Sequence, residues 1–396
     1  MISPRLLAQL ACPTCLEAAG CPRCTRPAGH AGCLDYAARA ACACGGPDKV
    51  ALAPEEGGLR CPCCARVYPL QADYADLWTE EGGDPHEGTL YDDHEFQERL
   101  RVSGAPPLLS ARVKADLMRG MLDLAPGETV LDLGCGAGKM ALYAHGHGAR
   151  ATGLDAAPYF LPAAAAAVDL LRGDLRRLPF RKGSFAAAYS IDVLEHLDED
   201  GVRDLLLEAR RVLAPGGRLF VYTHAMESSR LASFQRGVNR LAKRLGRAGL
   251  IDHEREAMRK ADHRNPLRSH EHFDALCAGA GLAVRERRYY NVVFKAVVED
   301  LGLRLVEQAR ARRKRTGTAT DHGHGDVHGD VHGHGHGHEA APVAPAQPGR
   351  VALAVGHALT WLLKLDVVFF GGIRTGPFFA LIRPLAPAAA PSEPSK

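Results

Sequence analysis

The sequence of 396 residues predicts an α/β fold built around a mostly parallel sheet. Between residues 85 and 225, short apolar runs alternate with stretches of helical pattern, which is the order of β–α–β units. A glycine-rich turn follows the first apolar run, and acidic residues follow the next three. Because ligands of such sheets bind at the carboxyl ends of the strands, these residues indicate a binding site along one edge.

The apolar runs and helical stretches predict five strands before residue 225, together with helices around and after them. The expected strands cover, in chain order, 130–133, 149–155, 168–173, 184–190 and 218–223. Expected helices cover 139–145, 199–213 and 269–280.

Composition divides the chain into four parts. The expected boundaries are 1–80 for a small cysteine-rich module, 85–300 for the sheet domain, 317–349 for a disordered His-rich linker, and 350–386 for an apolar helix with the final strand. The linker is too polar and glycine-rich to bury a core. Lys364 and Asp366 interrupt the apolar segment, so we expect a buried or surface-lying helix there rather than a membrane span.

The glycine-rich turn, DLGCGAGK, begins at Asp132. Met140 stands where a phosphate-binding P-loop has Ser or Thr, and Lys139 stands where a dinucleotide motif has its third glycine. The remaining pattern suits a ligand without a pyrophosphate, and the alternative is a strand–helix turn that binds nothing. Asp155 ends the second strand 23 residues after Asp132, near the spacing at which an acid binds ribose hydroxyls.

Five motifs in order make residues 85–225 resemble the class I S-adenosylmethionine (SAM)-dependent methyltransferases, especially the type 11 group related to quinone-biosynthesis enzymes. The motifs are VLDLGCGAGK, GLD, GDLRRLPF, SIDVLEHL and RVLAPGGRLF. The resemblance implies a Rossmann-like, seven-stranded sheet and SAM as the cofactor. The sixth and seventh strands of that sheet are then 283–290 and 377–382, and the stretch between them is a large helical insertion before the last strand. It implies cofactor contacts by Asp132, Gly134, Gly136, Gly138, Asp155, Asp174, Leu175 and Asp192.

The same resemblance gives these residues separate roles. The three glycines pack against the methionine part of SAM, and Asp155 binds the ribose hydroxyls. Asp174 and the backbone of Leu175 meet the adenine. Asp192 lies beside the cofactor at the end of the fourth strand.

Three histidines are candidates for the acceptor side. His196 follows the fourth strand, His224 follows the fifth, and His263 precedes the helix expected at 269–280. Methyl transfer to a hydroxyl or an acidic carbon needs a general base, and His196 is the catalytic candidate for that role. The alternative is that His196 only caps or packs.

The cysteines predict a zinc-binding module. Ten of the twelve lie between Cys12 and Cys64, and two Cys-x2-Cys pairs, Cys12 with Cys15 and Cys61 with Cys64, supply four thiolates for tetrahedral zinc. Cys63 is a substitute ligand. The flanking sequences LLAQLACPTC and LRCPCCARVYPL resemble the zinc-ribbon family that includes methyltransferase-activator subunits.

The insert between these two pairs carries further cysteines. They are either free thiols or ligands of a second zinc ion, with Cys33 or His30 as substitute ligands. The candidate ligands of the second ion are Cys21, Cys24, Cys42 and Cys44.

Together these features predict a SAM-dependent methyltransferase for a small-molecule or lipid-like acceptor. The alternative is an RNA methyltransferase whose zinc module and arginine-rich stretches, 236–268 and 309–315, form one basic face. The net charge of +3 favours neither. The basic amphipathic segment 228–250 is either a membrane-surface helix or a lid. Without a secretion signal, clustered cysteines predict a cytoplasmic protein, with peripheral membrane contact as a further expectation.

Overall fold

The structure, a computed structural model, describes residues 3–16, 48–79, 107–250, 263–264, 266–306 and 350–385. The strands of the main sheet are β6 (Ala75–Asp76), β7 (Thr129–Leu133), β8 (Arg150–Asp155), β9 (Asp169–Arg172), β10 (Phe185–Ile191), β11 (Leu213–His224), β12 (Leu282–Tyr289) and β13 (Pro377–Pro384). The helices that accompany them are α4 (Leu109–Leu122), α5 (Lys139–Gly146), α6 (Pro162–Ala165), η4 (Leu194–His196), α7 (Glu199–Val212), α8 (Ala232–Arg247), α10 (His270–Gly279), α11 (Val293–Val297), η5 (Val298–Leu303) and α13 (Arg350–Phe370).

The main sheet confirms the expected α/β fold and all seven expected strands. Its order is β12-β13-β11-β10-β7-β8-β9-β6. Strand β13 runs opposite to all the other strands, so its pairings with β11 and β12 are antiparallel. The sheet has eight strands rather than seven, because β6 of the N-terminal segment pairs with β9 at one edge. The central strands β7, β8 and β10 are buried along most of their length, as expected for strands covered on both faces.

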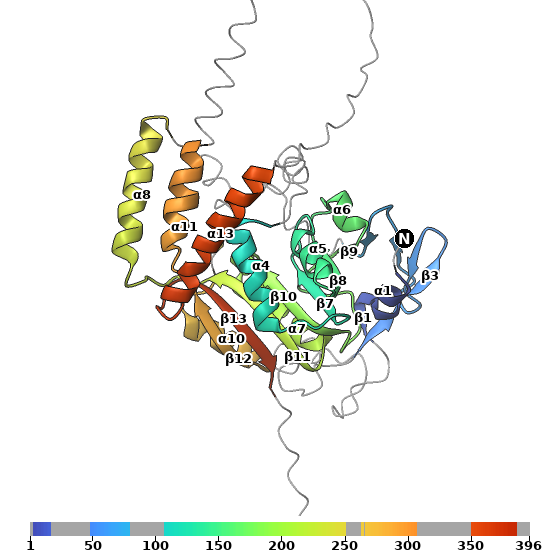
Figure 1. Cartoon of the computed structure of the whole chain (residues 1–396). Coiled ribbons are helices and arrows are strands. Elements are labelled where there is room, and N and C mark those ends of the chain that lie inside the picture. Colours follow the sequence, from blue (N-terminus) through green and yellow to red (C-terminus); the bar gives the residue numbers. More distant parts are fainter. Residues whose placement is uncertain are drawn as a thin grey trace, which may run out of the picture.

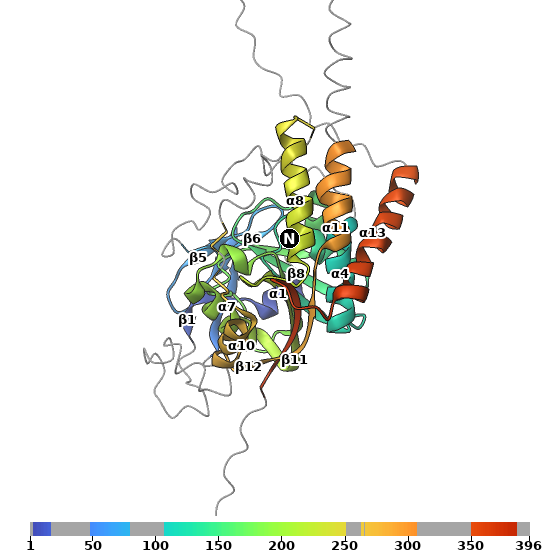
Figure 2. The ribbon, with the colours of Figure 1, turned by 90° about the vertical axis from the view of Figure 1, so that its left-hand side faces the viewer.

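Helices cover both faces of the sheet (Figure 1 and Figure 2). One core cluster joins the sheet to α4, α5, α6 and α13, and the other joins it to α7, α10 and the N-terminal module. The layers are therefore helix, sheet and helix. The expected helices after β7, after β10 and before β12 are all present, with ends within two residues of expectation.

The N-terminal module packs directly on the sheet domain. Its elements are α1 (Pro4–Gln9), β1 (Ala11–Leu16), β2 (Lys49–Ala51), β3 (Ala53–Glu55), β4 (Gly58–Arg60) and β5 (Val67–Pro69). Leu10 and Tyr68 lie in the same buried cluster as Phe180 of the sheet domain. The boundary expected at residue 80 is therefore not a break in the core. The candidate second zinc ligands and the His-rich linker lie outside the described residues.

Three helices, α8, α11 and α13, stand side by side at one end of the molecule (Figure 1 and Figure 2). Residues 353–370 of α13 are long and apolar enough to cross a membrane, and 17% of this stretch is buried. The two charged residues inside this stretch, Lys364 and Asp366, contact the rest of the domain. Lys364 Nζ lies 2.6 Å from Asp116 Oδ2 of α4, and the buried Asp366 accepts hydrogen bonds from the backbone of Phe294 and Lys295. These contacts attach α13 to the domain surface.

A buried ionic network attaches the module to α7. The Glu208 carboxylate, fully buried, accepts hydrogen bonds from Lys49 Nζ at 2.9 Å and from the Arg211 guanidinium at 2.8 and 2.9 Å. Lys49 Nζ also donates to the carbonyl oxygens of Pro13 and Leu178, at 3.0 Å each. The Lys49 and Arg211 cations and the Glu208 carboxylate thus lie together in a buried contact between the module and the sheet domain.

Replacing Glu208 by Gln is expected to lower the free energy of unfolding by about 3–5 kcal/mol, because the Lys49 and Arg211 charges stay buried without their counter-charge. Urea unfolding followed by circular dichroism measures this change. The control is Arg288→Gln, which removes an exposed ion pair with Glu286 and should cost less than about 1 kcal/mol. Equal small losses in both variants would show that the network contributes little to stability.

Candidate active site

The glycine-rich turn joins β7 to α5, and its three glycines have different roles. Gly134, Gly136 and Gly138 have φ of 78°, 51° and 81°, where other residues are strained. A Cβ at Gly134 would collide with Val193, and a Cβ at Gly138 would lie 2.9 Å from Ala164 Cβ. Beside Gly136 there is open space instead. The backbone therefore favours glycine at all three positions, and Gly136 alone of the three leaves room beside it for a ligand.

Asp155, at the end of β8, is hydrogen-bonded to this turn. Its Oδ2 accepts from the Gly136 N–H at 2.7 Å, and its Oδ1 accepts from the Ala157 N–H at 3.0 Å. The turn and the acid are thus in contact, although 19 residues separate Gly136 from Asp155. A cofactor bound at this edge would meet both the backbone of the glycine turn and the Asp155 carboxylate, which is the arrangement expected from the sequence.

Asp132 lies beneath the turn and is 2% exposed. Burial and the nearby Asp155 charge raise its pKa to about 8, against the lowering influence of Tyr189 and the backbone of Ala141. A carboxyl group with that pKa is mostly neutral at pH 7. Its side chain interacts with Tyr189 of β10 and the backbone of Ala141 in α5, and a direct cofactor contact by Asp132 stays a prediction.

Asp174 and Asp192 follow β9 and β10 at the same edge. The Asp174 carboxylate accepts from the Arg176 backbone at 2.8 Å and from its guanidinium, while Leu175 packs against the core. Asp192 has φ of 57° and forms an ion pair with Lys114 of α4. Left-handed backbone at a residue other than glycine is strained, and such residues concentrate at functional sites. The adenine and cofactor roles of these residues stay predictions.

A buried carboxylate lies among the three candidate histidines. Glu195 is 2% exposed and its Oε2 accepts a hydrogen bond from Thr223 Oγ1 at 3.0 Å. His224 Nδ1 lies 3.6 Å from its Oε1. Burial alone would raise the pKa of Glu195, but its interaction with His224 lowers it to about 2, so the group is ionised at neutral pH. The rings of His196 and His263 meet edge to face, with centroids 4.8 Å apart.

The structure adds two residues that sequence reasoning missed. Glu195 stands between two expected site residues, Asp192 and His196, in the SIDVLEHL motif, so its position was a usable signal. Lys114 comes from α4, 78 residues before its partner Asp192, and nothing in the local sequence marks it. Only the packing of α4 against the sheet brings it to the site.

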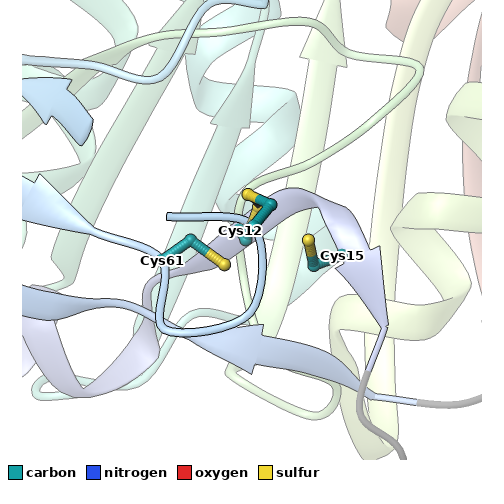
Figure 3. Close-up of side chains that lie close together, drawn as sticks. Cys12, Cys15 and Cys61 are labelled. Atoms are coloured by element: carbon teal, nitrogen blue, oxygen red, sulfur yellow. Dashed lines mark hydrogen bonds between the residues drawn. The ribbon is translucent and has the colours of Figure 1, made fainter. Parts of the chain in front are cut away.

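The four expected zinc ligands come together at the other end of the molecule. Cys12 and Cys15 lie on β1, and Cys61 follows β4 (Figure 3). Cys64 lies in the turn directly after Cys61. Their four Sγ atoms all lie within 4.8 Å of one another, and the Cys12 and Cys64 sulfurs are 3.9 Å apart. Zn–S bonds of about 2.3 Å in a tetrahedron place sulfurs about 3.8 Å apart. The donor set therefore fits zinc, and the exposed Cys63 stands outside it.

Hydrogen bonds also favour the thiolate form of Cys12. Its Sγ lies 3.2 Å from the Tyr68 hydroxyl and 3.4 Å from the Thr14 hydroxyl. Burial would raise the pKa of Cys12, but the bonds from Thr14 and Tyr68 hold it at about 6.

Comparison with known proteins agrees with this geometry. Residues 131–221 match the type 11 methyltransferase domain family. An O-methyltransferase of Aspergillus nomiae is 30% identical over 171 residues, which cover 40% of this chain and 72% of that protein. A 37.1 kDa protein from a Streptomyces fradiae transposon is 34% identical over 176 residues, or 42% of this chain and 49% of that protein. The chain belongs to the class I SAM-dependent methyltransferases.

Solved structures of methyltransferases are also similar. Phosphoethanolamine N-methyltransferase 2 of Haemonchus contortus, in complex with SAM, has a TM-score of 0.41 and 16% identity. The similarity covers 73% of this chain and 56% of that protein.

Replacing Asp155 by Asn is expected to weaken SAM binding by about 1–3 kcal/mol, roughly 5- to 150-fold, because the ribose hydroxyls lose an ionised acceptor. Isothermal calorimetry with SAM or S-adenosylhomocysteine measures the affinity. Asp200→Asn is the control, since that carboxylate is 85% exposed and pairs only with Arg203 among the interactions described for it. Unchanged affinity in a correctly folded Asp155 variant would contradict the assignment of the ribose site.

Proposed function

We propose that this protein transfers the methyl group of SAM to a hydroxyl of a small-molecule or lipid-like acceptor. The observation that carries the proposal is the open space beside Gly136, bordered by Asp155, at the same sheet edge as Asp192 and the histidines. The names of relatives support a hydroxyl acceptor. Besides the Aspergillus nomiae protein, an O-methyltransferase of Aspergillus sclerotiorum is 32% identical over 171 residues.

The chain's own residues divide the work between binding and proton transfer. When bound, SAM supplies a methyl group on a positively charged sulfur. Asp155 and the Gly136 backbone fix the cofactor's position, and Asp174 with Leu175 borders the adenine side. Holding the acceptor oxygen in line with the methyl group accounts for most of the rate enhancement. A hydroxyl must also lose its proton, and His196 is the candidate base.

The RNA alternative has less support. It requires the zinc module and the arginine-rich helix α8 to form one basic face. In Figure 1 the module lies at the right of the molecule and α8 at the left, with the sheet between them. Among the described residues, the two surfaces are therefore separate, and a small acceptor is favoured.

We further propose that the protein works in the cytoplasm and contacts an anionic membrane surface from which it takes a lipid-like acceptor. The exposed side of α13 carries large apolar side chains, with Trp361 66%, Val368 71% and Phe369 63% exposed. The exposed residues of α8 include Arg236, Arg240, Lys243 and Arg247. Apolar and cationic side chains at one end of a molecule suit the interface of an anionic bilayer.

Incubation with methyl-labelled SAM and a fractionated cell extract tests both proposals. Label is expected in the lipid or small-molecule fraction and not in RNA or protein, and Asp155→Asn should reduce it in proportion to the lost SAM affinity. Sedimentation with anionic vesicles should carry the protein down, and the double variant Trp361→Asp with Phe369→Asp should stay in solution. Label in RNA would contradict the proposed acceptor class. Equal sedimentation of both forms would contradict the membrane contact.

We also propose that Cys12, Cys15, Cys61 and Cys64 hold one structural zinc ion. A closed four-thiolate site stabilises a fold and leaves no position for substrate. Cys12 and Cys61 belong to the core cluster shared with the sheet domain. Zinc is therefore expected to stabilise the contact between module and domain, beyond the module itself.

The double variant Cys12→Ser with Cys61→Ser is expected to lose one equivalent of zinc and to unfold at lower urea concentration than wild type, because metal binding is coupled to folding. Atomic absorption after passage over a chelating resin measures the metal. Cys63→Ser is the matched control on the same turn and should keep the zinc. Equal zinc content in both variants would rule out the four-cysteine site.

A further inference from the structure

Four side chains with metal-ligating atoms gather around the buried carboxylate of Glu195 near the ends of β10 and β11. They form two groups that share Glu195. One group adds His196 and His263, and the other adds Asp192 and His224. In each group, one ligating atom per residue lies within 4.8 Å of the others. Carboxylate and imidazole together suit divalent cations such as Mn²⁺ and Zn²⁺.

Glu195 is the residue that belongs to both groups, so its surroundings bear on both. One of its oxygens accepts the Thr223 hydroxyl, and the other lies 3.6 Å from His224 Nδ1, which is longer than a hydrogen bond. Glu195 is 2% exposed, so its carboxylate group has lost most of its hydration and is held in one orientation by Thr223. The oxygen that faces His224 is therefore available to a cation held by the neighbouring histidines.

The group with His196 and His263 is the better cation site. The Arg264 N–H donates to the Glu195 carbonyl oxygen at 2.8 Å, which holds the segment of His263 against η4. The two imidazoles already meet edge to face. In the other group, the Asp192 carboxylate pairs with Lys114 and is 43% exposed. A cation there would face the lysine ammonium, so repulsion disfavours that group.

We propose that Glu195, His196 and His263 bind one divalent cation on the acceptor side of the site. Its catalytic use rests on the proposed methyl transfer, but the binding itself does not. An acceptor hydroxyl whose oxygen binds this cation becomes more acidic, because the positive charge stabilises the oxyanion.

The remaining step is a displacement in which charges and electrons balance. The acceptor oxygen forms a bond to the methyl carbon with one of its lone pairs. The carbon–sulfur bond breaks and its electron pair stays on the sulfur. The products are a neutral methyl ether and neutral S-adenosylhomocysteine, and the proton of the acceptor hydroxyl passes to solvent. In this arrangement His196 is a metal ligand, which replaces the role of free base considered for it above.

Titration of the full chain with Mn²⁺, with free Mn²⁺ followed by electron paramagnetic resonance, tests the binding without SAM or acceptor. Wild type should bind one Mn²⁺ more than Glu195→Gln or His263→Asn. The cysteines and the His-rich tract are present in every variant, so their contribution cancels in the difference. His272→Asn is the matched control, because His272 also pairs with a glutamate, Glu199 at 3.4 Å, and stands outside both groups. It should bind as wild type does.

Three results would overturn the proposal. Equal Mn²⁺ binding by the Glu195, His263 and His272 variants would exclude the site. Loss of the ion in Asp192→Asn and His224→Asn, but not in His263→Asn, would place it in the other group. Misfolding is detected separately, because SAM affinity should be unchanged in the Glu195, His263 and His272 variants.

Activity separates this inference from the proposed function. If the cation takes part in catalysis, His263→Asn should slow methyl transfer by roughly 10- to 100-fold, and His272→Asn should not. Methyl transfer at the wild-type rate by a His263 variant that has lost the ion would exclude the catalytic role. Wild type that binds Mn²⁺ but labels no acceptor would contradict the proposed function and leave the cation site standing.

Discussion

The common direction of five neighbouring strands is the constraint on which the site depends. Strands β7 to β11 are parallel, so the chain leaves each of them at the same edge of the sheet. Backbone hydrogen bonds between neighbouring strands hold the residues at this edge in place. The Gly134 and Cys135 N–H groups donate to the Leu154 carbonyl oxygen, and the Asp192 N–H donates to that of Tyr222. Residues far apart in sequence meet here because the strands that carry them cannot slide.

Several features of this edge lower the stability of the fold and are typical of functional sites. Asp132 is a carboxyl group kept neutral by burial, Glu195 is a buried ionised one, and Asp192 has a strained backbone. Each costs free energy that the apolar clusters on both faces of the sheet must offset. The rigid sheet holds these groups in place, which is what a reaction that relies on alignment requires.

Two additions extend the sheet domain in opposite directions. The N-terminal module joins one face through the Lys49–Glu208 contact, and α13 joins the other through Asp366. The module carries the thiolates and lies away from the candidate acceptor residues. Helix α13 packs on α4, whose Lys114 reaches Asp192, so the exposed apolar helix is adjacent to the edge where the acceptor is expected. This adjacency is why we connect the helical end of the molecule with a lipid-like acceptor.

The sequence alone determined the local patterns. Strand and helix periods predicted the first five strands and their helices, and the family resemblance predicted the last two strands. The glycine turn and Asp155 predicted the cofactor edge, and Cys-x2-Cys spacing predicted the four clustered cysteines. These signals are local, because backbone conformation and ligand geometry depend on residues close in sequence. The eighth strand β6, the pairing of Lys114 with Asp192 and the meeting of His196 with His263 were decided only by tertiary structure. These contacts depend on which helix and sheet faces pack together. Burial of those faces, and not a local sequence pattern, brings together residues that lie tens of positions apart.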